Sequence, residues 1–222
     1  MKEAYFTPTT LEVTARRMLL QLEEFRRRRS RPFTPPSSAL LVLDMQVYFL
    51  DPSSHAYIPS ALAILPGIDA LTRAFFEYGQ PVIFSRHLNS PEDAGQMAVW
   101  WRDLITAENP LSEITPELDR SRGSIVQKNQ YDAFQATSLE EILRSRGVSQ
   151  VVICGVMTHL CCETTARSAF MRGFEVFFTI DGTATYTEEF HRASLLNLAH
   201  GFATPVLVGD IMAAFEGGNE SS

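Results

Sequence analysis

The sequence has few cysteines, few lysines and no long apolar run. Its 222 residues contain three cysteines, Cys154, Cys161 and Cys162, all within one short segment. Three clustered thiols cannot form a disulfide framework, so we expect a reducing, cytoplasmic environment. No stretch of about 18 uninterrupted apolar residues is present, so no membrane span is expected. The N-terminus, MKEAYFTPTTLEVTARR, also lacks the apolar region of a secretory signal peptide.

The excess of negative charge argues against nucleic acid as the main partner. The formal net charge is −7, which opposes binding to a phosphate backbone. One basic run, RRRRSR at residues 26–31, ends an expected helix, where solvated cations favour the helix C-terminus. Nucleic-acid binding is the alternative role for this run, but nothing near it resembles a nucleic-acid-binding module.

Lysine is rare among the basic residues. Of the 19 lysines and arginines, only Lys2 and Lys128 are lysines. A lysine can shift its pKa and exchange a proton, whereas an arginine stays charged. Lys128 ends the apolar run SIVQK, so we interpret it as a functional residue. A compositional accident in an arginine-rich sequence is the alternative interpretation.

From residue 38 onward, short apolar runs alternate with helical patterns. The runs are 39–45, 81–87, 124–128, 150–156, 174–181 and 204–210, and the helices are expected around 66–78, 137–146, 159–172 and 187–200. Apolar strands buried on both faces and separated by helices predict a three-layer α/β/α domain with a mainly parallel sheet.

Residues 1–37 precede this domain, which we place at 38–222. An amphipathic helix is expected over 9–29, with Leu11, Ala15, Met18, Leu22 and Phe25 on its apolar face. A proline-rich linker follows it. The helix could pack on its own domain or on a partner subunit, and its apolar face makes a homo-oligomer, a dimer or tetramer, our expectation.

Binding sites in parallel α/β folds lie outside the carboxyl ends of the strands. That rule selects Asp44, His87, Lys128, the residues after Cys154, and Asp181. Asp44 ends a buried strand, where a carboxylate needs a partner or a turn to cap. Lys128 is the expected partner.

The two adjacent cysteines are expected in the first turn of a helix. A helix N-terminus stabilises a thiolate and lowers its pKa, and a nearby Lys128 would add to this effect. Cys162 shares an apolar strip with Ala166 and Ala169, whereas Cys161 is followed by polar residues, so Cys161 is expected to face the site. Structural burial of all three thiols is the alternative. The sequence lacks a Cys-x-x-Cys motif and the spacing of a zinc site.

Three segments carry a resemblance to a known family: LLVLDMQVYFL, VQKNQYDAFQATSLEEIL and ICGVMTHLCCETTARSAFMRGFEV, within a region from about residue 38 to 212. They resemble the isochorismatase-like cysteine hydrolases, which include nicotinamidases, N-carbamoylsarcosine amidases and isochorismatases. The resemblance implies a Rossmann-like fold with a six-stranded sheet. It also implies a catalytic triad of Asp44, Lys128 and Cys161.

Further site residues follow from the same resemblance. A cis peptide is implied between Val156 and Met157, and an oxyanion hole from the backbone N–H groups of Met157 and Cys161. The residues implied or considered for the substrate pocket are Gln46, Phe49, His87, Trp100, Tyr131 and Thr158. Thr158 and Thr165 are both implied to support the nucleophile turn. Trp101 could share the pocket wall with Trp100, and Arg86 or Arg102 could bind a substrate carboxylate. Core or subunit-interface packing is the alternative for the tryptophans.

The resemblance implies C–N hydrolysis of a small amide or carbamoyl compound through a thioester on Cys161. The segment FSRHLNSPED lacks the aspartate and histidines of the nicotinamidase metal motif, so no metal or other cofactor is expected. True isochorismatases resemble the chain around His159, but have glycine in place of Cys161. An enol-ether hydrolase using Asp44 as its acid is therefore the first alternative, and a catalytically idle family member is the second.

Overall fold

The computed structural model describes residues 2–29, 32–101 and 103–217. At its centre lies a six-stranded sheet in the order β3-β2-β1-β4-β5-β6, and every strand pair is parallel. The strands are β1 (Ser38–Leu43), β2 (Val82–His87), β3 (Ser124–Lys128), β4 (Gln150–Val156), β5 (Glu175–Ala184) and β6 (Thr204–Val206). The expected α/β fold and six-stranded parallel sheet are confirmed.

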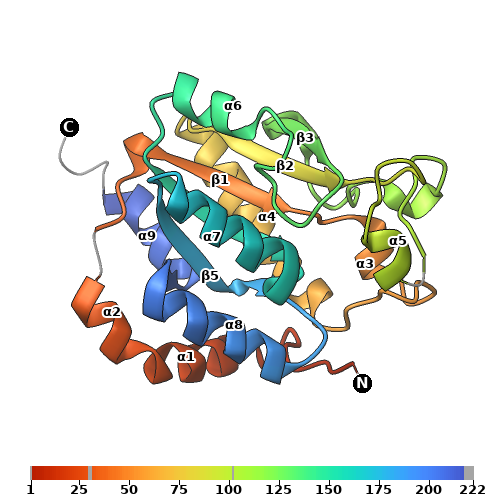
Figure 1. Ribbon diagram of the computed structural model, residues 1–222. Helices are drawn as coiled ribbons and strands as arrows, with labels where there is room; N and C mark the ends of the chain where they lie inside the picture. Colours follow the sequence, from red (N-terminus) through yellow and green to blue (C-terminus); the bar gives the residue numbers. More distant parts are fainter. Residues whose placement is uncertain (1, 30–31, 102, 218–222) are drawn as a thin grey trace.

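Helices cover both faces of the sheet. They are α1 (Leu11–Gln21), α2 (Glu23–Arg29), α3 (Val47–Leu50), α4 (Ala61–Glu77), α5 (Met97–Trp100), α6 (Leu139–Ser145), α7 (Glu163–Met171), α8 (Glu188–Gly201) and α9 (Val208–Gly217). Helices α7 and α8 contact each other on one face, and α4 and α9 contact each other on the opposite face (Figure 1). Within the described ranges, no helix has the length and apolar character needed to cross a membrane.

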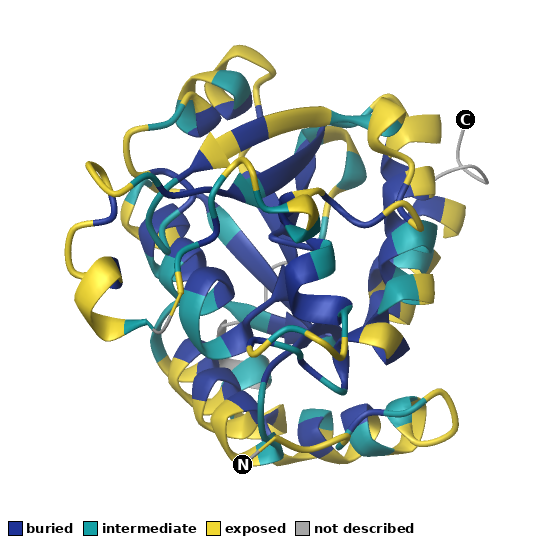
Figure 2. Ribbon diagram, turned by 90° about the vertical axis from the view of Figure 1, so that its right-hand side faces the viewer, coloured by how far each residue is buried: buried dark blue, intermediate teal, exposed yellow. Residues whose placement is uncertain are grey.

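The apolar runs of the sequence form strands because both of their faces are covered. Every residue of β1 and of β4 is buried. Figure 2 shows these central strands in the colour of buried residues, with exposed residues gathered on the outer helices and loops. Burial of apolar surface on both faces is the main free-energy gain that fixes this arrangement.

The leading helix differs from the continuous helix expected over 9–29. The chain changes direction at Leu22, between α1 and α2, so that α1 contacts β5 while α2 contacts α8 and β6. Ala15, Met18 and Leu22 are buried in the core of the same chain. This apolar face therefore packs on its own domain and does not support the expected homo-oligomer. In the basic run, Arg26 lies 3.7 Å from Asp210, and the side chains of 27–31 lie outside the description.

The prediction of a strand over residues 204–210 is mostly wrong. β6 ends at Val206, and α9 begins two residues later. Two carboxylates satisfy backbone donors at the start of α9: Asp181 Oδ1 accepts from the N–H of Val208 (2.7 Å), and Asp210 Oδ2 accepts from that of Leu207 (3.0 Å). Such capping favours a helix there. β5 continues past Asp181, which is therefore not at a strand end.

Candidate active site

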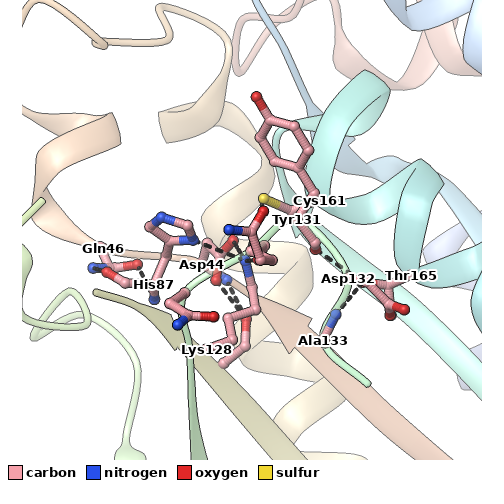
Figure 3. Close-up of polar contacts among 12 residues, drawn as sticks. Asp44, Gln46, His87, Lys128, Tyr131, Asp132, Ala133, Cys161 and Thr165 are labelled. Carbon is pink, nitrogen blue, oxygen red and sulfur yellow. Dashed lines mark hydrogen bonds and ion pairs between the residues drawn. The ribbon is translucent and has the colours of Figure 1, made fainter. Parts of the chain in front are cut away.

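The carboxyl ends of the four adjacent strands β3, β2, β1 and β4 bring the chemistry together. Asp44 directly follows β1, His87 and Lys128 end β2 and β3 in register with each other, and Cys161 lies in the turn after β4. Figure 3 shows the Lys128 ammonium between Asp44, His87 and the sulfur of Cys161. The strand-end rule thus identified three of these four residues directly.

Lys128 is the centre of the polar cluster. Its Nζ lies 2.8 Å from Asp44 Oδ2 and 3.4 Å from Cys161 Sγ, and the side chains of Lys128 and Asp44 are 0% exposed. It also lies 2.9 Å from the carbonyl oxygen of Gln130 and 3.2 Å from His87 Nδ1. One ammonium thus faces four acceptors with three hydrogens to donate.

The two oxygens of Asp44 have different surroundings. Oδ1 accepts a hydrogen bond from Ser85 Oγ (2.6 Å), and Ser85 Oγ accepts one from the Asp44 N–H (3.0 Å). Oδ2 is buried beside Lys128, with no hydrogen bond of ordinary geometry to the described residues. Burial by itself would raise the pKa of Asp44, but the positive charge of Lys128, together with His87 and polar contacts from Cys161 and Lys128, outweighs it, so the pKa is lowered. Asp44 is therefore ionised, with Oδ2 facing the site.

The thiol of Cys161 differs from the expected low-pKa cysteine. Burial, aided by the negative charge of Asp44, raises the pKa of Cys161 to about 12, and Lys128 opposes this only in part. Cys161 lies in a π-helical turn, Thr158–Cys162, that precedes α7, rather than in the first turn of an ordinary α-helix. The resting thiol is therefore protonated and needs a base to become a nucleophile.

The other two cysteines are buried in the core. Cys154 and Cys162 are both 0% exposed, and burial raises the pKa of each thiol. The peptide bond between Val156 and Met157 is cis. It lies between β4 and the π-helical turn, and Met157 and Cys161 both line a pocket.

His87 is a neutral imidazole in the pocket wall. Burial and the charge of Lys128 lower its pKa to about 4. Its Nδ1 faces the Lys128 ammonium at 3.2 Å, and its Nε2 lies 2.8 Å from Asn89 Oδ1. A neutral ring that accepts at Nδ1 and donates at Nε2 satisfies both contacts.

The pocket above Cys161 has a volume of about 60 Å³, and its mainly apolar wall includes five aromatic rings. Trp101 Nε1 donates to Tyr131 Oη (2.7 Å), which fixes one side of the wall. The lining residues are Tyr48, Phe49, His55, Ala56, His87, Asn89, Met97, Trp101, Asp103, Leu104, Ile105, Tyr131, Met157, Leu160, Cys161 and Tyr186. Of the expected pocket residues, Phe49, His87 and Tyr131 lie in this wall.

Three expected pocket residues lie elsewhere. Trp100 is 78% exposed, because adjacent residues at the end of a helix point in different directions and only Trp101 turns inward. The buried amide of Gln46 accepts from the N–H of His87 and donates to the carbonyl oxygens of His87 and Ser112. Its role is therefore to connect the residues after β1 to the end of β2 and to Ser112. Thr158 is fully buried and faces His191 at 3.0 Å.

The proposed carboxylate-binding arginines do not line the pocket. Arg86 donates to the carbonyl and hydroxyl oxygens of Ser112 and lies 2.7 Å from Glu113. Arg102 lies outside the described residues. No lysine or arginine is among the described residues of the wall, and Asp103 adds an acidic group.

Several wall residues were missed by the sequence reasoning. Asn89 could have been found, because it follows His87 at the two-residue spacing of a strand face. His55, Asp103 and Tyr186 come from loops, and no local pattern places a loop residue at a distant strand end.

A parallel α/β fold with a thiol, an ammonium and a carboxylate at its strand ends is the architecture of a cysteine hydrolase. Within that class, the chain belongs to the isochorismatase family, since a family model described as the isochorismatase domain matches residues 38–210. The protein is thus a hydrolase, and the family predicted from the three sequence segments is confirmed.

The relatives include both amide and isochorismate enzymes by name. The chain is 47% identical to nicotinamidase 3 of Arabidopsis thaliana over 171 residues, which cover 75% of this chain and 82% of the relative. It is 29% identical to an isochorismatase of Bacillus subtilis, covering 80% of this chain but only 58% of that protein.

Solved structures share the fold. A cysteine hydrolase from Pseudomonas syringae pv. phaseolicola superposes with a TM-score of 0.81 at 27% identity, covering 85% of this chain and 96% of the other. A pyrazinamidase of Pyrococcus horikoshii in complex with zinc has a TM-score of 0.69 at 28% identity, covering 78% and 99%.

The zinc in that relative raises the question of a metal in this pocket, and the residues here do not fit one. Both ring nitrogens of His87 already have partners, Lys128 and Asn89. His55 Nδ1 contacts Tyr48 Oη and Asp103. Across the described ranges, no three histidine, cysteine or acidic side chains gather in a metal-binding arrangement. We therefore assign no catalytic step to a metal.

Proposed function

We propose that the protein hydrolyses the C–N bond of a small aromatic carboxamide, with Cys161 as nucleophile. The observation that carries this proposal is the position of the Cys161 thiol, in an aromatic pocket and 3.4 Å from the Lys128 ammonium that pairs with Asp44. The similarity to a plant nicotinamidase supports an amide as the substrate.

The pocket wall favours a flat, uncharged substrate. Rings of Tyr48, Phe49, Trp101, Tyr131 and Tyr186 face the space above the thiol. Aromatic rings pack well against another ring, by stacking or edge-to-face. The described wall residues offer no arginine or lysine to a carboxylate. Isochorismate is a dicarboxylate, so this wall is a poorer match for it than for an aromatic amide.

The reaction begins with proton transfer. Asp44 Oδ2 accepts the proton of the Cys161 thiol, and Lys128 stabilises the thiolate. Sulfur attacks the carbonyl carbon, and the N–H groups of Met157 and Cys161 are assigned to the oxyanion. The C–N bond breaks as Asp44 returns the proton to the leaving amine.

Water then completes the cycle. Asp44 takes a proton from a water molecule, whose oxygen attacks the thioester carbonyl. The C–S bond breaks, the carboxylic acid leaves, and the proton on Asp44 returns to the sulfur of Cys161. The net reaction is that an amide and water give a carboxylic acid and an amine.

The enol-ether alternative uses Asp44 as an acid and so requires its protonated form. In spite of burial, Lys128 and the other groups around Asp44 together keep its pKa low, and a carboxyl held ionised is a poor proton donor at neutral pH. An idle family member would have no need of the buried contacts among Asp44, Lys128 and Cys161, whose charges are costly to bury without a function.

The first prediction compares the two adjacent cysteines. Cys161→Ala should abolish hydrolysis of nicotinamide or a related amide, whereas Cys162→Ala should keep most of it, because only the Cys161 thiol reaches the pocket. Mass spectrometry of wild type during turnover should show an acyl adduct on Cys161. Equal activity in both variants would contradict the assignment, and cleavage of isochorismate without an adduct would support the enol-ether hydrolase.

A further inference from the structure

The residues before α1 contact two walls of the pocket, although they precede the family-matched region. We call Lys2–Phe6 the N-terminal segment. The N–H of Glu3 donates to the carbonyl of Tyr186 (2.8 Å), and Lys2 Nζ lies 4.7 Å from the centre of the Tyr186 ring. Lys2 also donates to the carbonyl of His55. Tyr186 and His55 both line the pocket, so this segment joins two wall loops that are distant in sequence.

The segment is fixed in place by further contacts. Phe6 is buried, and its N–H donates to Ser60 Oγ (3.1 Å), which in turn donates to the carbonyl of Glu3 (3.2 Å). Glu3 Oε2 accepts from the N–H of Glu188 at the start of α8 (3.1 Å). Backbone and side chain are therefore both held, as expected for an integral part of the fold.

Tyr5 extends this connection to the nucleophile turn. Its Oη accepts from the N–H of Thr185 (2.9 Å) and lies 3.1 Å from His191 Nδ1. The same nitrogen lies 3.0 Å from Thr158 Oγ1. Thr158 is the first residue of the π-helical turn that carries Cys161. A chain of side-chain contacts thus runs from Tyr5 to the turn of the nucleophile.

Burial makes this chain of contacts rigid. His191 and Thr158 are 0% exposed, and burial lowers the pKa of His191 to about 3, so its ring is neutral. Burial also raises the pKa of Tyr5, which keeps its hydroxyl protonated. Because water does not replace a lost partner in such a site, removing the Tyr5 hydroxyl leaves the N–H of Thr185 without its acceptor and breaks the contact to His191.

We propose that the N-terminal segment belongs to the active site, with Tyr5 as a positioning residue for the Cys161 turn. Lys2 is the specificity-determining residue of the segment, since it holds Tyr186 and His55 at their spacing across the pocket. The proposal rests on Cys161 being the nucleophile, as proposed above.

The experiment compares Tyr5→Phe and Lys2→Ala in the full chain, using carboxamide turnover and the rate of Cys161 alkylation by iodoacetamide. Tyr5→Phe should lower kcat and the alkylation rate about tenfold with KM little changed, as loss of a buried hydrogen bond predicts. Lys2→Ala should raise KM about two- to fivefold with little change in kcat, which matches an exposed cation–π contact.

Arg16→Ala is the matched control, because Arg16 pairs on the exposed face of α1 with Glu12 (3.1 Å) and contacts no wall residue. If Tyr5→Phe and Lys2→Ala both behave like Arg16→Ala, the proposal is overturned. Thr158→Val breaks the same chain of contacts at its other end, between Thr158 and His191, and replaces Tyr5→Phe if that variant does not fold. If wild type hydrolyses no carboxamide, the proposed substrate fails, while slower alkylation of Tyr5→Phe still supports the positioning role.

Discussion

In the proposed mechanism, Lys128 stabilises both the protonated and the deprotonated state of the Cys161 nucleophile. Its ammonium faces Asp44 Oδ2 at 2.8 Å and Cys161 Sγ at 3.4 Å. When the thiol proton moves to Asp44, the carboxylate loses its charge and the sulfur gains one, so the negative charge moves from one side of the ammonium to the other. The net charge of the buried site stays constant, which avoids the cost of creating a new buried charge.

The assignment of Asp44 as the base leads to a prediction about pH. Because the pKa of Cys161 is about 12 and that of Asp44 is lowered, wild-type kcat/KM should be flat from about pH 6 to 9. Asp44→Asn should lose about 10²- to 10⁴-fold in kcat/KM, the usual contribution of a general base. Its residual rate should rise with pH as solvent deprotonates the thiol.

Ser85→Ala is a milder test of the same general base than Asp44→Asn. It removes the hydrogen bond to Oδ1 but keeps the carboxylate, so kcat/KM should fall less and the flat pH profile should persist. A flat profile in Asp44→Asn would show that another group removes the proton.

Whether a site residue could be predicted from the sequence depends on the element that carries it. Asp44, His87 and Lys128 could be predicted because strand ends in a parallel sheet share one edge. The choice of Cys161 over Cys162 followed from the spacing of neighbouring helical residues. Trp101 could not be separated from Trp100, since α5 has four residues and sets no face by periodicity.

At the level of elements, the junction of β4 with the π-helical turn depends on Gly155. Its φ is +113°, and a Cβ there would lie 2.1 Å from the carbonyl oxygen of Leu43 in β1. The pairing of β4 with β5 also shifts register between Ile153 and Gly155. The close backbone approach thus brings the carboxyl ends of β1 and β4, and with them Asp44 and Cys161, together.

Gly155→Ala should therefore destabilise the protein strongly. We expect the free energy of unfolding to fall by about 3–5 kcal/mol, since both the space and the backbone conformation exclude a side chain. Gly209→Ala is the matched control in α9, where nothing lies within 4 Å of the added carbon, and it should be neutral or stabilising by up to about 1 kcal/mol. Urea unfolding measures both, and equal midpoints for the two variants would refute the steric argument.

Elements were predictable where one pattern held over a whole segment. The strands β1 and β4 were found because they are apolar runs in which every residue is buried. β2 and β3 were found from shorter apolar runs that end in polar residues. The prediction for β6 ran too far because its apolar run passes into α9, and the caps that start α9 include Asp181, from the neighbouring strand β5. The bend at Leu22 depends on α1 and α2 packing on different elements, which is tertiary information.

For the whole molecule, the buried histidines determine how stability depends on pH. His87 and His191 have folded pKa values of about 4 and about 3, against 6.5 for an ordinary histidine. The unfolded chain therefore binds protons that the folded chain excludes once the pH falls below about 6.5. Their stabilising effect is complete above that pH and is lost as pH falls toward about 4.

We expect the free energy of unfolding at pH 5 to be lower than at pH 7.5, by on the order of 2 kcal/mol for each histidine. Asp181 offsets part of this loss, because burial raises its folded pKa to about 6 and its protonation favours the folded state as pH falls. Urea unfolding at the two pH values tests the prediction. His87→Asn should reduce the pH dependence and Asp181→Asn should steepen it; stability that does not change with pH would contradict it.

The active site forms only when several strands of the sheet have assembled in their final order. Asp44 follows the central strand β1, Lys128 ends the edge strand β3, and Cys161 follows β4 on the other side of β1. These contacts are distant in sequence, and such pairings form only after long loops have closed. No contiguous fragment shorter than β1 through the π-helical turn holds all three groups. Turnover therefore reports that the whole sheet has assembled. Helix content does not, because a chain can recover its helices without forming the active site.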